Sequence, residues 1–512
     1  MATMISPAPH RASMLALLSL PLLPAWPTTA AAVDWTVVPT VRVRESYTDN
    51  VNLAPPAQAQ GELSTEFSPG IALDVHDGPR LQLALSYAWH AVTYQRRRGR
   101  SDHQLDASAH AEVLPGWLYL GARSNISLQN ISGFGPRQLD PAQDASNSQT
   151  VRAHSFSPYL QHYFRGLATA TLRYDVQRVD SGRLLQVTSD AANLRLLGDN
   201  GGRGWNWDLM LDRRHVDDSA LAPVTMSDAA LTLSYPVNST LGAFATGGYE
   251  QKDYHATSRQ PEGKYWSAGG NWAPSPRTRV SASFGRRYFG RTYALDAAYR
   301  MRSMAWTVTY HEDITTMHAQ FFSIAPAGLS DFLYQLWETK IPDPQKRLQS
   351  IKVFLLISQM LGTDGNVNFF SHRYYLQKSL RVASVYSGTR GALAFNLART
   401  DRTAQTSSAV DSILTGPDEL TLEDRTRQSA AQAGWNWRLS ARTGVTVGAS
   451  HSRAQSLTTG RQDRNSVLSA TFSHQLRPGL GADIHLRHSR HASNAGGNYR
   501  ENGVGAAVTA AF

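Results

Sequence analysis

The chain has 512 residues, with 50 lysines and arginines against 40 aspartates and glutamates, so its formal charge is +10. It has no cysteine, which excludes disulfide bonds, thiolate metal sites and a cysteine nucleophile. The length suits several soluble domains or one very large β architecture, and the charge leaves open an ordinary basic surface or an anionic partner.

Residues 1–32 have the pattern of a secretory signal peptide. His10 and Arg11 precede the apolar run MLALLSLPLLPAW, and the small residues TTAAA lead into VDW. The run is too short, and too interrupted by Pro21 and Pro24, for a permanent membrane helix. We therefore expect cleavage after Ala32, export from the cytoplasm, and a mature domain over residues 33–512.

From residue 33 onward, apolar and polar residues alternate in many segments. In Arg80 to Tyr94, the leucines, Tyr87 and Trp89 fall on one parity, and glutamine, serine and histidine fall on the other. A period of two predicts β-strands with one apolar and one polar face. The same pattern occurs in QLDASAHAEV, WNWDLML, VSASF, TYALDAAYRM and GADIHLRH.

Short and long connections alternate along the chain. Short turns rich in glycine and proline, such as HDGPR, LPGW and RPGL, alternate with long polar links such as QRRRGRSDH and SGFGPRQLDPAQDASNSQT. This asymmetry is typical of outer-membrane barrels, so we predict an all-β, transmembrane, antiparallel up-and-down barrel of roughly 22 strands, within a range of about 16–24. A soluble β-solenoid remains an alternative because several outward parities are rich in alanine, although no fixed repeat supports it.

One segment, 313–368, departs from the alternation. Asp343 and Pro344 have the residue types of a helix start, apolar residues follow at helical spacings, and Gly362 is a candidate stop. SDFLYQLW, beginning at Ser330, predicts a shorter helix. Counting turns places this helical insertion in one long outer loop, as an extracellular lid or a plug whose apolar stripes are buried against the barrel.

The chain ends in NGVGAAVTAAF, an alternating strand with an aromatic last residue, Phe512. This ending resembles the terminal signal of barrels that the barrel-assembly machinery inserts, and an ordinary final strand is the alternative. Tryptophan occurs 12 times, often beside predicted strands, as expected for rings at a membrane interface.

No catalytic, cofactor-binding or metal-binding motif was found. HEDITTMH places His311 and His318 on opposite faces of a strand, and Ser101 to His103 lie too close in sequence to form a relay. We therefore expect a protein that is not an enzyme and has no cofactor. Arginine suits carboxylate and phosphate oxygens. The candidate lumen or rim contacts for an anion are Arg42, Arg44, Arg96, Arg97, Arg98, Arg213, Arg214, Arg286, Arg287 and Arg291, with contact to anionic lipid as the alternative.

The stretches VRVRESYTDNVNLAP, SPGIAL and DPQKRLQSIKVFL resemble outer-membrane β-barrel proteins associated with the PEP-CTERM/exosortase system, and the wider group of β-barrel porins. The resemblance spans nearly the whole mature chain, although its motifs are short. It implies a location in a Gram-negative outer membrane and a link to exopolysaccharide production, and it carries over no catalytic residue. For Tyr47 to Asn50, a structural turn is favoured over a ligand site.

These observations predict a porin-like outer-membrane barrel that serves exopolysaccharide export or surface organisation. The alternatives are a non-conducting scaffold or assembly partner of the polysaccharide machinery, and an outer-membrane hydrolase. The expected partners are outer-membrane lipid, the barrel-assembly machinery and an anionic exopolysaccharide; no nucleic-acid partner is expected.

Overall fold

A computed structural model describes residues 33–512 except for 79, 144–146, 183–184, 199–203, 258–259, 323–370 and 409–420. The expected signal peptide lies outside the described residues, as do the predicted helices that begin near Ser330 and Asp343.

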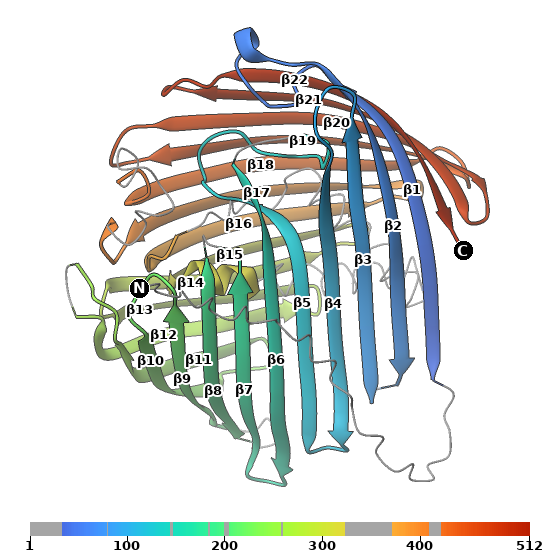
Figure 1. Cartoon of the computed structure of the whole chain (residues 1–512). Coiled ribbons are helices and arrows are strands. Elements are labelled where there is room, and N and C mark those ends of the chain that lie inside the picture. The colour runs from blue at the N-terminus through green and yellow to red at the C-terminus, as the bar shows by residue number, and fades with distance from the viewer. Residues whose placement is uncertain are drawn as a thin grey trace, which may run out of the picture.

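The fold is one antiparallel sheet of 22 strands in which each strand pairs with its neighbour in the chain (Figure 1). The strands are β1 (Asp34–Thr48), β2 (Glu62–Asp77), β3 (Leu81–Tyr94), β4 (Arg100–Leu114), β5 (Leu118–Asn130), β6 (Ser148–Phe164), β7 (Ala168–Asp180), β8 (Gln186–Gly198), β9 (Asn206–Asp218), β10 (Val224–Pro236), β11 (Leu241–Lys252), β12 (Glu262–Ser275), β13 (Thr278–Arg287), β14 (Gly290–Arg300), β15 (Met304–Thr315), β16 (Tyr375–Ser387), β17 (Gly391–Ala404), β18 (Arg425–Arg438), β19 (Thr443–Ser456), β20 (Gln462–Arg477), β21 (Leu480–Ser493) and β22 (Tyr499–Ala511). The prediction of an all-β barrel of roughly 22 strands is confirmed.

The sheet closes because its first and last strands also pair. Residues Thr40–Thr48 of β1 run antiparallel to Gly503–Ala511 of β22. Closure gives the backbone N–H and C=O groups of both edge strands hydrogen-bonding partners, which an open sheet would leave unpaired.

The YTDN stretch at the end of β1 lies at this seam. The Asp49 carboxylate accepts hydrogen bonds from the Asn502 backbone N–H and side-chain amide, both at 2.7 Å. The Asn50 amide donates to the carbonyl oxygens of Ala54 at 2.7 Å and Arg500 at 3.0 Å. These residues join β1 to β22, so the structural interpretation of YTDN fits their contacts.

The alternation of the sequence becomes the two faces of the barrel wall. In β3, Leu85 and Tyr87 lie directly opposite Leu73 and Ile71 of β2, and this parity faces outward. Tyr47, Phe67, Phe284, Leu486 and Val508 lie on outward parities and leave 44% or more of their surface exposed, among many similar side chains. Alternate positions point inward, and they carry most of the buried charged residues.

The two ends of the barrel differ in their connections. At one end the links are short, for example 115–117, 276–277 and 478–479. At the other end the chain makes the longer links 49–61, 131–147, 316–374 and 405–424. The predicted alternation of short turns and long loops is therefore confirmed, and we call these two ends the short-turn end and the long-loop end.

The predicted insertion at 313–368 needs correction where it is described. Asp313 and Thr315 still belong to β15 and pair with β16, so the strand extends into the segment expected to be helical. The helix α1 (Met317–Phe322) follows, and a 3-10 turn, η1 (Pro56–Gln58), occurs in the first long loop. Among the described residues, α1 and η1 are the helical elements, and the rest of the predicted insertion, 323–368, lies outside the described residues. Within the described residues, no helix has the length and apolar character needed to cross a membrane.

Candidate functional site: a loop docked inside the barrel

The link between β5 and β6, residues 131–147, folds into the barrel interior. Figure 1 shows it in teal, running from the end of β5 across the view toward β18 and β19. The Asn147 side-chain amide donates to the carbonyl oxygens of Ser132, Phe134 and Pro136 at 3.1–3.2 Å, which draws the start and end of the loop together. The glycine and proline residues of SGFGP suit such a compact turn.

The tip of this loop is held by a group of buried charges, which we call the latch cluster: Arg44, Glu66, Asp140, Arg487 and Glu501. Asp140 Oδ2 lies 2.6 Å from Arg44 Nη2 and 2.8 Å from Arg487 Nη1. Arg487 also contacts Glu501, with Nη2 to Oε1 at 2.7 Å and Nε to Oε2 at 3.1 Å. One loop carboxylate thus bridges inward-facing arginines of β1 and β21.

The latch cluster is almost fully removed from water. The side-chain exposure is 4% for Asp140, 7% for Arg487 and 0% for Glu501. Buried charges of this kind are tolerated only when each is paired and hydrogen-bonded. Thr48 and Ser489 supply such bonds by donating to Glu501 at 2.8 and 3.1 Å.

The electrostatics of Asp140 follow from these partners. Burial raises the pKa of its carboxyl, but the Arg44 and Arg487 guanidiniums and the Ala142 backbone N–H favour the ionised form more strongly, so the pKa lies well below its ordinary value of 3.8. Burial lowers the pKa of Arg137, which lies in the same loop, to about 10. Asp140 and Arg137 therefore both remain charged at neutral pH, so the loop contacts the barrel wall through charged side chains.

Other contacts hold the loop against the far wall. The Gly135 backbone N–H donates to Asp463 Oδ2 at 2.7 Å, and Arg137 Nη1 donates to Ser452 Oγ at 3.1 Å. Phe134 packs with Leu422 and Ala454. The loop therefore extends from β5 and β6 to the inner faces of β19 and β20, and it narrows the opening between these walls.

The two ends of the β15–β16 link also lie inside the barrel. Phe321 of α1 packs among Val151, Val179, Val187 and Val216, which are inward-facing residues of β6 to β9. On the return, His372 Nδ1 lies 2.7 Å from Asp218 Oδ1. Both described ends of the long link thus cover the inner wall at β6 to β9.

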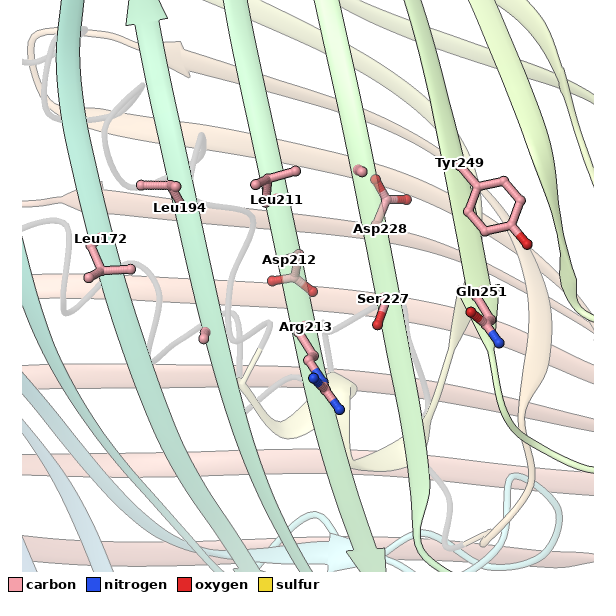
Figure 2. Close-up of a pocket in the computed structure, with 11 residues that line it drawn as sticks. Leu172, Leu194, Leu211, Asp212, Arg213, Ser227, Asp228, Tyr249 and Gln251 are labelled. Carbon is pink, nitrogen blue, oxygen red and sulfur yellow. The ribbon is translucent and has the colours of Figure 1, made fainter.

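One groove lies on the outer face of the wall and not in the interior. It has a volume of about 380 Å³ and is lined by Leu172, Ala192, Leu194, Leu211, Asp212, Arg213, Ser227, Asp228, Ala229, Tyr249 and Gln251 (Figure 2). Ala192 and Ala229 are short side chains between larger outward-facing ones, which explains the hollow. It is therefore a feature of the external surface and not part of the candidate passage.

The structure separates the arginines selected from the sequence into three sets. The set that faces inward is Arg42, Arg44, Arg214 and Arg287. The second set lies in the link after β3 and comprises Arg96, Arg97 and Arg98. The third set faces outward, so it does not line the lumen, and comprises Arg213, Arg286 and Arg291. Three of the inward arginines are paired: Arg42 with Asp483 at 3.0 Å, Arg44 with Asp140, and Arg287 with Glu250 and Asp313. Little of their charge is left for an anion in the interior.

Several residues of the site were missed by sequence reasoning. The link containing Asp140 was recognised only as a long polar connection, and Glu66, Arg487 and Glu501 were not selected. The available signal was the combination of unusual length, a glycine- and proline-rich start, and an aspartate near the middle of the link. Among the described residues, no cluster of three or more potential metal ligands occurs.

Comparisons with known proteins give distant structural likenesses only. No family model matches the chain, and no curated protein matches it. The siderophore receptor PirA from Pseudomonas aeruginosa shares 7% identity over 93% of this chain and 80% of its own, with a TM-score of 0.44. The FrpB iron transporter from Neisseria meningitidis (F5-1 variant) shares 10% identity over 93% and 81%, with a TM-score of 0.47. Pseudomonas aeruginosa OccK2 (OpdF), solved in complex with glucuronate, shares 9% identity over 94% and 98%, with a TM-score of 0.35. TM-scores this low give no weight to a functional transfer.

Proposed function

We propose that this chain is an outer-membrane β-barrel of the porin-like kind, through which hydrophilic solute passes, and that the loop 131–147 narrows the passage. The observation that carries the proposal is the two-sided wall. Large apolar and aromatic side chains remain exposed on the outside, whereas buried ion pairs lie on the inside, and one group of them holds the docked loop. A closed sheet with this distribution suits a hydrocarbon exterior and a wet interior.

The ends of the barrel support an orientation. The start of β1, the end of β22 and the short turns share one end, while the long links occupy the other. In barrels of this class the short turns are periplasmic and the long loops extracellular. With this orientation the latch cluster lies toward the external mouth, where a loop can control entry.

Planar-bilayer conductance of the purified protein tests the proposal. The wild type is expected to conduct in steps, and Asp140→Asn is expected to give larger or noisier steps because it removes the charge that holds the loop to Arg44 and Arg487. Asp483→Asn is the matched control, since it removes one inward carboxylate, the partner of Arg42, without touching the loop. If neither the wild type nor Asp140→Asn conducts, the passage is excluded and a non-conducting scaffold is the better description.

We further propose that the passing or retained polymer is an exopolysaccharide. This step is supported by the resemblance of VRVRESYTDNVNLAP and SPGIAL to barrels of the PEP-CTERM/exosortase system. Current block by an anionic polysaccharide, compared with a neutral dextran of equal length, tests it. Stronger current block by the anionic polymer would support an anionic substrate. Equal block by both polymers would show that the charge of the polymer is not required, and no block by either would exclude polymer passage.

A further inference from the structure

Four arginines form a row on the outward face of β19 to β22, near the long-loop end. Arg453 of β19 lies directly opposite Arg464 of β20, and Arg490 of β21 lies directly opposite Arg500 of β22. All four side chains are exposed. We call these residues the arginine row.

This register places like charges beside one another. Directly opposite side chains in antiparallel strands have Cβ atoms about 4.5–5.5 Å apart, and like charges in these positions destabilise the pairing. Within the described part of the chain, no carboxylate pairs with any residue of the row. Arg453 donates only to the neutral amides of Gln462 at 2.6 Å and Gln455 at 3.4 Å. The positive charge is therefore not compensated by the protein.

The same arrangement occurs at a second place on the outer wall. Arg286 of β13 lies directly opposite Arg291 of β14, both are exposed, and neither has a carboxylate partner among the described residues. A repeated like-charged register on the outer face indicates that the compensating anion comes from outside the chain.

The outer surface next to the arginine row, toward the middle of the barrel wall, is apolar. Toward the middle of the same strands and on the same face, Leu468, Leu486 and Val504 are 53%, 52% and 45% exposed. Cationic groups above exposed aliphatic groups match the order of headgroup and acyl chain in a lipid. A soluble polyanion would need only the arginines.

We infer that the arginine row binds the phosphate groups of a phosphorylated, acylated lipid in the leaflet around the long-loop end. The planar guanidinium matches two phosphate oxygens at once, and paired arginines gain most from an anion between them. The acyl chains of the lipid lie against Leu468, Leu486 and Val504. This inference rests on the membrane location given under the proposed function.

Native mass spectrometry of the whole barrel in detergent tests the inference, with dioleoyl phosphatidate as the probe. Dioleoylglycerol supplies the acyl chains without phosphate, and inorganic phosphate supplies the anion without acyl chains. The variant Arg464→Gln/Arg490→Gln should weaken phosphatidate binding about thirtyfold, since each arginine near an anionic lipid contributes about fivefold. The matched control is Arg442→Gln/Arg477→Gln, which removes two charges at the short-turn end, one just before β19 and one at the end of β20.

Weaker phosphatidate binding by Arg464→Gln/Arg490→Gln, with unchanged binding by the control variant, would support the inference. The inference would be overturned if phosphatidate binding fell equally in both variants or was unchanged in both. It would also be overturned if dioleoylglycerol bound as tightly as phosphatidate. Inorganic phosphate that displaces phosphatidate at equal concentration would also overturn it, because the site would then take any anion. The measurement does not depend on conductance. A barrel that binds phosphatidate but does not conduct would therefore support the lipid-binding inference and contradict the proposed passage of solute.

Discussion

Arg286 and Arg287 are neighbours in β13, yet they lie in two different environments. Arg287 points inward and contacts Glu250, with Nε to Oε1 at 3.0 Å and Nη2 to Oε2 at 2.5 Å, and it also contacts Asp313. Arg286 points outward, opposite Arg291, with no carboxylate partner in the described chain. Arg287 is therefore paired within the protein, whereas Arg286 is open to an external anion. Not every outward arginine is open in this way, because Arg399 and Arg427 both contact Asp401 on the outer face.

The physical reason is the solvent on each side. The Glu250 side chain is 0% exposed, so its charge is stable only beside a guanidinium. The outer arginines are exposed and can be neutralised by ions or headgroups. One residue of displacement along a strand therefore changes the role of an arginine from structural partner to surface contact.

The largest effect is expected from breaking the inner pair. Arg287→Ala leaves Glu250 buried without its main partner, which should lower the free energy of unfolding by about 3–5 kcal/mol. Arg286→Ala, one residue away, should change it by no more than about 0.5 kcal/mol. Guanidinium unfolding followed by tryptophan fluorescence measures both, and equal effects of the two variants would contradict the division into inner and outer faces.

A smaller loss is expected when the outer face is made polar. Leu231 of β10 is 43% exposed on the outward parity, and Leu231→Arg should cost about 2–4 kcal/mol in a lipid bilayer. The next residue, Thr232, points inward and shares a hydrogen bond with Thr246 at 2.8 Å, so Thr232→Arg is the matched control. Unfolding in liposomes should show the larger cost for Leu231→Arg; the reverse order would mean that this face does not meet hydrocarbon.

The smallest of the three effects concerns pH and the latch. The pKa of Asp140 is lowered from its ordinary value of 3.8 because Arg44 and Arg487 outweigh its burial. The ionised Asp140 contributes about 1.5–3 kcal/mol to holding the loop, the usual size for hydrogen bonds to charged groups. This contribution is present above pH 3.8 and is lost as the pH falls through the lower pKa that Asp140 has in the folded protein. Conductance steps should keep their size from pH 7 down to about 4 and enlarge only below that.

Asp140→Asn controls for this acid effect, because its amide does not titrate. Its steps should already be enlarged at neutral pH and should change little on acidification. A wild-type barrel whose steps enlarge between pH 7 and 5 would show that another group controls the loop.

Much of the wall could be predicted from the sequence. The parity in Arg80 to Tyr94 predicted which side chains of β3 face outward. Strand number and the alternation of link lengths were also predicted, because turn residues and a period of two are local properties. The inward position of Arg287 beside the outward Arg286 follows from the same rule, once the register is known.

The docked loop could not be predicted in this way. Arg44 and Arg487 lie 443 positions apart in the sequence, and Asp140 joins them from a third region, so no local pattern connects the three. The segment expected to fold over or into the barrel mouth was 313–368, and its described part does place Phe321 among inward-facing residues. The loop of the latch cluster follows β5, and no prediction placed it inside the barrel. Which carboxylate meets which arginine depends on barrel closure.

By itself, the sequence determined the two-faced strands, their approximate number and the asymmetry of the links, because each depends on residues close together in the chain. Only the tertiary structure decided that β1 meets β22, that Asp140 reaches Arg44 and Arg487, and that Arg453 faces Arg464 while Arg490 faces Arg500. These pairings depend on strand register and closure, which bring distant residues within a few ångströms and so decide whether a charge is paired or left for an outside partner.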